Sequence, residues 1–299
     1  MKNIVLMDGA VGTSLWEKAT DKVPVWRYNI ENPKIVAELQ REYLDAGAQI
    51  ILADTFAANG VEVHRESPYS VEEVVGTAVK IAKDTINGKA KVGLAIGPLT
   101  GLLAPFGKIS LQTAKDLFEE QIGAGMAEKP DVVYIQTFMD LVMLKIAVQA
   151  ANHYDVPVLC SMSFMGGGKG GRAASDVKKG RVAHTMMGNS VKDILEGLKD
   201  CRVDGVGINC SMGPVEAMPV LEEFKAATDM PLVFKPNAGK PTVAQDGTMG
   251  ASFDIETFAN DVLPAVDKGA TYIGGCCGSN AAYIKRLGEK IREKLEAEG

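Results

Sequence analysis

Short apolar runs recur along the whole chain and alternate with amphipathic segments. Eight of these runs are rich in aliphatic and β-branched residues and lack the strict apolar–polar alternation of a half-exposed strand. This pattern is typical of strands that are buried on both faces, as in a parallel sheet. The runs lie at 4–8, 49–56, 91–97, 131–138, 156–164, 203–210, 231–236 and 271–275.

Each apolar run is followed by a segment whose apolar residues have helical spacing. These predicted helices lie at 33–46, 71–86, 111–126, 141–152, 191–200, 215–228, 255–268 and 281–297. Eight strand–helix units in 299 residues, with no low-complexity linker, predict an α/β protein with one domain over residues 1–299, a (β/α)8 TIM barrel. The alternative is a doubly wound open sheet. The barrel is favoured because the first run leads into Asp8-Gly9-Ala10-Val11-Gly12, which lacks the full dinucleotide-binding spacing.

Polar and thiol residues gather where the predicted strands end. Active sites of barrel enzymes lie at the carboxyl ends of the strands, because the loops that follow the strands meet there. We therefore expect the residues at these ends to surround one site. They are Asp8, Asp54-Thr55-Phe56, Gly97-Pro98, Gln136-Thr137, Asn209-Cys210, Asn237 and Cys276-Cys277.

Three of the five cysteines are expected to form a metal site. Cys210 follows one predicted strand, and Cys276 and Cys277 follow another, each beside glycines that allow close approach to the backbone. Two successive residues can ligate one metal only where the strand ends and the backbone turns, which Gly275 and Gly278 permit. Three thiolate ligands indicate zinc, and a vacant fourth tetrahedral position is typical of a catalytic zinc. The alternative is that the three cysteines only pack in the core.

A zinc ion with three thiolate ligands carries a net negative charge. Such a site is poorly suited to producing hydroxide and well suited to holding a fourth, nucleophilic sulfur. Hydrolytic zinc sites more often use histidine and carboxylate ligands, and His64, His153 and His184 are not spaced for metal binding. Cys160 and Cys201 are predicted to be buried structural thiols.

Composition and charge exclude several classes of protein. The net charge of -6 and the lack of dense Lys/Arg clusters argue against binding to nucleic acid or to an anionic membrane. The sequence shows no signal peptide and no run of about 18 apolar residues. We expect a soluble, cytoplasmic protein, whose odd number of five cysteines is not a disulfide framework.

The connection after the fifth run is much longer than the others. A glycine-rich segment at 165–181 precedes the helix that begins near Ser190, and loops of that length usually have a function. We predict a mobile lid, and the alternative is an insertion without a role. The spacing is not that of a phosphate-binding P-loop. A barrel lyase acting on phosphorylated substrates is also disfavoured, because the cysteine pair ends the strand where a phosphate site would be built.

Seven short motifs, distributed from the first strand to the last, match one family. In these motifs the chain resembles the homocysteine S-methyltransferases, which include the homocysteine-binding barrel of cobalamin-dependent methionine synthase and betaine–homocysteine methyltransferase. The resemblance implies that Cys210, Cys276 and Cys277 ligate a zinc that binds the thiol of homocysteine, which is methylated to methionine. The motifs are Met7-Asp8-Gly9-Ala10-Val11-Gly12-Thr13, Asp54-Thr55-Phe56-Ala57-Ala58-Asn59, Gly97-Pro98, Thr185-Met186-Met187-Gly188, Gly207-Ile208-Asn209-Cys210-Ser211-Met212-Gly213-Pro214, Pro236-Asn237-Ala238-Gly239-Lys240-Pro241 and Gly274-Gly275-Cys276-Cys277-Gly278.

The resemblance also implies a pocket for the acceptor. Asp8 would lie near the α-amino group of the acceptor, and Thr55 and Asn59 would help to line the pocket. At Gln136 the chain departs from the family, whose members commonly have an acidic residue there that helps to hold the ammonium group of homocysteine. Asp54 stands where the family often has asparagine.

The loss of an acidic residue at Gln136 and the gain of one at Asp54 allow two interpretations. In the first, the carboxylate has moved to Asp54 and pairs with the amino group, so that homocysteine is still the acceptor. In the second, the acceptor is a different thiol that lacks an α-ammonium group. One charge-assisted hydrogen bond is worth roughly 1.5–3 kcal/mol, so the exchange would alter acceptor preference by about tenfold to a hundredfold.

The predicted reaction is a direct displacement, in which the zinc-bound thiolate attacks an activated methyl group in line. The chain ends soon after the eighth predicted helix, without the pterin-binding and cobalamin-binding modules of methionine synthase, so the donor is expected to diffuse in or to arrive on another protein. The long loop and the motif at 185–188 favour a methyl-corrinoid protein, and S-methylmethionine and betaine are the alternatives. Trp16 and Trp26 would cage such a methyl-onium donor or, alternatively, only pack.

A hypothesis from another class is a non-catalytic subunit that binds zinc, a thiol or a corrinoid protein. Co-purification with a corrinoid protein, without formation of a methylated thiol, would favour it. The sequence does not determine the oligomeric state.

Overall fold

The strands of the main sheet form a closed parallel barrel. In this computed structural model, residues 3–165, 183–239, 242–243, 249–250 and 253–298 are described. The eight strands of the main sheet follow the order β1-β10-β7-β6-β5-β4-β3-β2, and all neighbours are parallel. They are β1 (Val5–Leu6), β2 (Ile50–Leu52), β3 (Lys91–Ile96), β4 (Val132–Phe138), β5 (Val158–Met162), β6 (Gly205–Asn209), β7 (Leu232–Lys235) and β10 (Ala270–Ile273).

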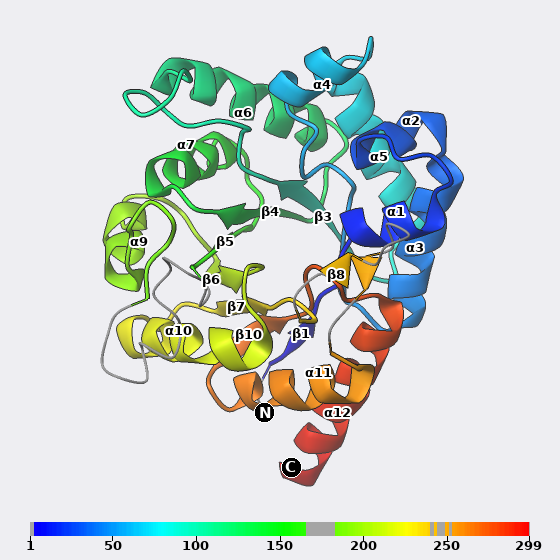
Figure 1. The fold of residues 1–299 in the computed structure, drawn as a ribbon, viewed down its shortest axis with the longest axis vertical. Helices are drawn as coiled ribbons and strands as arrows, with labels where there is room; N and C mark the ends of the chain where they lie inside the picture. Colours follow the sequence, from blue (N-terminus) through cyan, green and yellow to red (C-terminus); the bar gives the residue numbers. More distant parts are fainter. Residues whose placement is uncertain (1–2, 166–182, 240–241, 244–248, 251–252, 299) are drawn as a thin grey trace.

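The first and last strands of that order meet and close the barrel. Met7 forms a parallel bridge with Ile50, and the Gln49 amide donates a hydrogen bond of 2.7 Å to the Leu6 carbonyl. Figure 1 shows the strands at the centre of the molecule with helices around them. The predicted (β/α)8 barrel is therefore confirmed, and the open sheet is excluded.

The helices surround the barrel and begin at well-defined polar caps. Ser70, Ser110, Ser190 and Asp254 each accept a hydrogen bond from the first turn of the helix that follows, as N-cap residues commonly do. The helices are α1 (Gly12–Lys18), α2 (Tyr28–Glu31), α3 (Pro33–Asp45), α4 (Gly60–Glu66), α5 (Val71–Ile86), α6 (Leu111–Met126), α7 (Leu141–Ala151), α9 (Val191–Leu198), α10 (Pro214–Ala227), α11 (Ile255–Val262) and α12 (Ala281–Glu298), with 3-10 turns η1 (Val25–Arg27) and η2 (Leu263–Val266).

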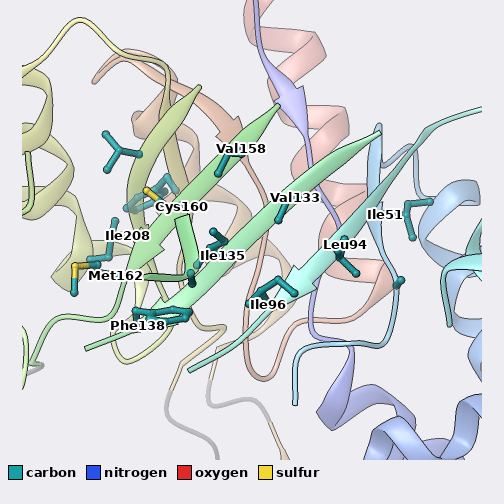
Figure 2. Packing of buried hydrophobic residues seen from close by; sticks show 14 of the residues in the cluster. Ile51, Leu94, Ile96, Val133, Ile135, Phe138, Val158, Cys160, Met162 and Ile208 are labelled. Atoms are coloured by element: carbon teal, nitrogen blue, oxygen red, sulfur yellow. The ribbon is translucent and has the colours of Figure 1, made fainter. Parts of the chain in front are cut away.

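The strands are buried on both faces because two apolar layers enclose them. On β4, Val132 and Tyr134 belong to the small cluster inside the barrel, whereas Val133 and Ile135 belong to the large cluster between barrel and helices. Figure 2 shows part of this outer layer, including Cys160. Both layers consist of apolar side chains, which explains why the strands read as continuous apolar runs.

Several details differ from the sequence-based expectations. The short helices α1, α2 and α4 were not predicted, because one or two turns are too short for a helical period to stand out. The predicted helix 255–268 is split into α11 and η2, where Pro264 cannot donate the backbone hydrogen bond of a continuous helix. A small antiparallel pair, β8 (Thr242–Val243) and β9 (Met249–Gly250), was also missed.

Other expectations concern burial and membranes. Cys160 is fully buried as predicted, whereas Cys201 is only partly buried at the edge of the core. Within the described part of the chain, no helix has both the length and the apolar character that crossing a bilayer requires. Apart from Met165, the predicted lid at 165–181 lies outside the described residues.

Candidate metal centre and substrate pocket

Three cysteines lie together at the carboxyl end of the barrel. The sulfur atoms of Cys210, Cys276 and Cys277 are all within 4.8 Å of one another, and those of Cys210 and Cys277 are 3.8 Å apart. Two thiolates on a tetrahedral zinc, each at about 2.3 Å from the metal, stand about 3.8 Å from each other. Among the described residues, no other group of three or more His, Cys, Asp or Glu side chains is gathered in this way.

The backbone turns after β10, so that successive cysteines both reach the cluster. The Gly275 amide bonds to the Asp8 carbonyl, and the Ser279 amide bonds back to the Cys276 carbonyl. Gly278 has a φ of +81°, a conformation that a side chain disfavours. A Cβ on Gly275 would lie 2.2 Å from the Ser279 hydroxyl oxygen, so the turn also requires glycine there for steric reasons. The turn expected from Gly275 and Gly278 is present.

Cys210 is held in the cluster by an unusual backbone at the end of β6. Cys210 and Ser211 have φ values of 60° and 61°, in the left-handed region that non-glycine residues rarely adopt. The Cys210 amide bonds to the carbonyl of Lys235 on β7, and the Met212 amide bonds to the Cys210 carbonyl. An unfavourable backbone conformation of this kind persists only where the surrounding contacts hold it in place, and it often marks a functional site.

The cluster does not favour ionised thiols unless a cation is bound. The pKa is raised to about 11 for Cys210 and to about 12 for Cys276 and Cys277. For Cys276, the hydrogen bond with Cys210 raises the pKa most, and burial adds to it. A divalent cation reverses this preference, because it binds thiolates and displaces their protons.

The three cysteines border a cavity of about 290 Å³. This volume is near the lower end of the range for small-molecule sites, roughly 300–1,000 Å³. The same cavity is bordered by Asp54, Gln136, Thr137, Lys235 and Trp16, and by the segment 9–13 that follows β1. The cysteines and the polar residues at the ends of β2, β4 and β7 therefore border one cavity, which a small thiol could occupy.

Asp8 and Lys235 form an ion pair in the interior of the barrel. The Lys235 Nζ donates to Asp8 Oδ1 at 2.6 Å, and the Leu52 amide donates to Asp8 Oδ2 at 2.8 Å. Both side chains are almost completely buried, and the Lys235 Nζ lies 5.6 Å from the centre of the Tyr134 ring. Lys235 was not predicted at the site, although a lysine inside an apolar strand run is itself a signal of a buried charge that needs a partner.

Asp54 is the second buried carboxyl of the pocket. Its side chain is 2% exposed and borders the cavity. Among the described residues, none forms a hydrogen bond with Asp54 Oδ2. Burial raises the pKa of Asp54 to about 7, because the ionised form is poorly solvated. A buried carboxyl with a perturbed pKa in a cavity is a common property of substrate-binding sites.

The other predicted pocket residues divide into two groups. Gln136, at 8% exposure, borders the cavity. Thr55 instead joins β2 to β3, since its hydroxyl donates to the Ala95 carbonyl at 2.7 Å and accepts from the Ala95 amide at 3.1 Å. Asn59 caps α4 by accepting from the amides of Val61 and Glu62. Neither Thr55 nor Asn59 borders the cavity.

Asn209, the last residue of β6, was predicted near the site but without a role. Its Oδ1 accepts from the Ser161 hydroxyl at 2.6 Å and from the Thr137 amide at 2.8 Å. Its Nδ2 donates to Thr137 Oγ1 at 2.7 Å and points to Cys276 Sγ at 3.8 Å. The asparagine thus connects β4 and β5 to one of the three sulfur atoms.

The two tryptophans do not share one environment. Trp16 is 39% exposed, borders the cavity and donates its indole N–H to the Val23 carbonyl. Trp26 is 1% exposed and packs in the outer core. The packing interpretation therefore holds for Trp26, and an aromatic cage built from both rings is not formed.

Comparison with known proteins places the chain in one family. The family model for homocysteine S-methyltransferase matches residues 5–291. A methionine synthase from Mycobacterium leprae is 23% identical over 97% of this chain and 24% of its own length. An S-methylmethionine–homocysteine S-methyltransferase, BHMT2, from Pongo abelii is 24% identical over 96% of this chain and 78% of its own length. The chain thus spans about a quarter of the length of this methionine synthase.

Solved structures show the same fold. The metallated form of the homocysteine methyltransferase MmuM from Escherichia coli superposes with a TM-score of 0.76 at 20% identity, covering 97% of this chain and 96% of that one. A methyltransferase from Methanosarcina mazei superposes with a TM-score of 0.62 at 12% identity, covering 98% and 94%. The match of the family model over nearly the whole chain shows that this protein belongs to the homocysteine S-methyltransferase family.

Proposed function

We propose that this protein is a zinc-dependent S-methyltransferase that transfers a methyl group to the thiol of homocysteine and forms methionine. The observation that carries the proposal is the convergence of Cys210, Cys276 and Cys277 at one wall of a cavity of small-molecule size. The membership in the homocysteine S-methyltransferase family supports the choice of acceptor.

The residues present fit a zinc ion. The donor set is three thiols, a set typical of zinc, and the 3.8 Å between two of the sulfur atoms suits tetrahedral coordination. Three protein ligands leave one position for the acceptor. When bound, zinc supplies a positive charge that keeps the acceptor sulfur deprotonated at neutral pH.

The chain itself contributes binding and orientation. Cys210, Cys276 and Cys277 would hold the metal, and Asn209 fixes the direction of Cys276. The cavity walls would orient the acceptor toward the donor. In the transfer a sulfur–carbon bond forms, the bond between the methyl carbon and the donor breaks, and its electron pair leaves with the donor. This step would need no general base, because a bound zinc would already have displaced the thiol proton to solvent.

The methyl donor is a methyl-corrinoid protein or a small methyl-onium compound. The methionine synthases among the relatives support the first class, and the S-methylmethionine-dependent relative supports the second. The position of Trp16 at the cavity suits a methyl-onium group, because an aromatic face attracts a cation.

Metal analysis combined with a donor screen tests the proposal. The purified protein should contain about one zinc per chain and convert homocysteine to methionine with one of the donors, as read by the mass of the product. Cys210→Ser, Cys276→Ser and Cys277→Ser should each lose zinc and activity, whereas the matched control Cys201→Ser should keep both. Full methylation by a triple serine variant would overturn the proposal. If the zinc-loaded protein methylates a thiol other than homocysteine, that thiol is the acceptor and the proposed acceptor is wrong. If it methylates no thiol, the result favours a non-catalytic binding subunit.

A further inference from the structure

We propose that Asp54, after β2, binds an ammonium group of the acceptor, and that Asp8 is withdrawn from this role by its ion pair with Lys235. The acceptor is then an aminothiol that is held between the cysteine cluster and strand β2. This inference rests on the proposed function, because it assigns the amino group of the same thiol acceptor.

Each carboxylate oxygen of Asp8 already accepts a hydrogen bond inside the barrel. One of its oxygens accepts from the Lys235 ammonium at 2.6 Å, and the other accepts from the Leu52 amide at 2.8 Å. The carboxylate is fully buried and does not border the cavity, whereas Lys235 does. A ligand ammonium that displaced Lys235 would leave this buried lysine without its counter-ion, which is strongly unfavourable.

Asp54 differs from Asp8 because one of its oxygens has no partner among the described residues. Its Oδ2 is buried and forms no hydrogen bond with any residue that the structure describes. Buried polar atoms in folded proteins nearly always have a partner, and the residue that carries this orphaned oxygen borders the cavity, where a ligand would supply the partner. Asp54 borders the same cavity as the three cysteines, so one small molecule can contact both.

The charges around the cavity favour a cationic group next to Asp54. Among the described residues that border the cavity, Lys235 is the only cationic one, and Asp8 neutralises it. Three thiolates with one divalent cation carry a net negative charge, and an ionised Asp54 adds another. The cavity therefore favours a positively charged group, and an ammonium on Asp54 would form a charge-assisted hydrogen bond in a site of low polarity.

Binding of two thiols that differ only in the amino group tests this inference. Homocysteine and 4-sulfanylbutanoate, its des-amino analogue, are titrated calorimetrically into the zinc-loaded protein without any methyl donor. We expect the wild type to prefer homocysteine by about tenfold to a hundredfold, as one charge-assisted hydrogen bond implies. Asp54→Asn should bring this ratio close to one, mainly through weaker binding of homocysteine.

Two further variants sharpen the result. Asp155→Asn removes the same charge from an exposed loop before β5 and should keep the wild-type ratio. The double variant Asp54→Asn/Gln136→Glu moves the carboxylate to the other polar position at the cavity, and recovery of homocysteine preference there would support the assignment of the pocket. A wild-type ratio near one, or an undiminished ratio in Asp54→Asn, would overturn the inference.

The same titration separates this inference from the proposed function. If the zinc-loaded wild type binds both thiols equally, the thiol site stands and the role of Asp54 is wrong. If it binds neither thiol, the proposed thiol site itself is wrong. Zinc content is measured for each variant, so that a loss of metal is not mistaken for a loss of the ammonium contact.

Discussion

At the scale of single residues, the pocket contains groups that lower the stability of the folded protein. Asp54 is buried without a full set of hydrogen bonds, and Cys210 has a left-handed backbone conformation. The three thiols have raised pKa values and are poorly ionised in the absence of a cation. Such costs are common at functional sites, where a ligand supplies the missing interactions.

The burial of Asp54 leads to a prediction about stability and pH. Burial raises the pKa of Asp54 to about 7 in the folded protein, from an ordinary aspartate value of 3.8. Between these two values the folded state binds more protons than the unfolded state, so the contribution of Asp54 to stability is lost as the pH rises through 7. The difference amounts to about 4 kcal/mol.

Urea unfolding of the metal-free protein at pH 5 and pH 8 measures this effect. Asp54→Asn should lose less stability than the wild type between the two pH values and should be the more stable of the two at pH 8. Parallel pH dependences in wild type and variant would show that Asp54 is solvated in the folded state.

Asn209 leads to a second prediction at this scale. Its Nδ2 points to Cys276 Sγ at 3.8 Å, and partners of metal ligands typically change metal affinity by about 10- to 100-fold. Asn209→Ala should weaken zinc binding by that factor, as measured by competition with a chromogenic chelator. The control Asn152→Ala, at the half-buried C-cap of α7, should bind zinc like the wild type. Unchanged zinc affinity in a folded Asn209→Ala protein would exclude this role.

At the scale of elements, the site depends on what lies at the ends of non-adjacent strands. Strand β10 separates β1 from β7 in the sheet, yet Asp8 and Lys235 meet inside the barrel. Asn209 similarly joins the end of β6 to β4 and β5. Each interaction connects segments far apart in sequence, and each positions a residue at the carboxyl end of the barrel.

A double-mutant cycle on the Asp8–Lys235 pair tests its importance for the barrel. Lys235→Met leaves the Asp8 carboxylate buried without its cation and should cost about 3–5 kcal/mol of unfolding free energy. Asp8→Asn should also destabilise the protein, because it leaves the lysine unpaired. The double variant should lose clearly less than the sum of the two single variants, as measured by urea unfolding. Additive losses would mean that the two charges do not interact in solution.

At the scale of the whole molecule, the sequence predicted the barrel well and its connections less well. All eight predicted strand runs overlap the strands of the barrel, because burial on both faces leaves an uninterrupted apolar signal. The boundaries of α5 and α6 also agree with the periodic segments 71–86 and 111–126. Short elements such as α4 and the β8–β9 pair carried no comparable signal.

The sequence by itself determined the eight strand–helix units and indicated the three thiols as a candidate metal site, because these features depend on local periodicity and on residue types beside glycines. Only the tertiary structure decided which polar residues contact one another. Lys235 forms an ion pair with Asp8, Asp54 borders the cavity, and Asn209 donates a hydrogen bond to the Cys276 sulfur. These contacts join residues on different strands, and their geometry depends on the closure of the barrel, which no local pattern specifies.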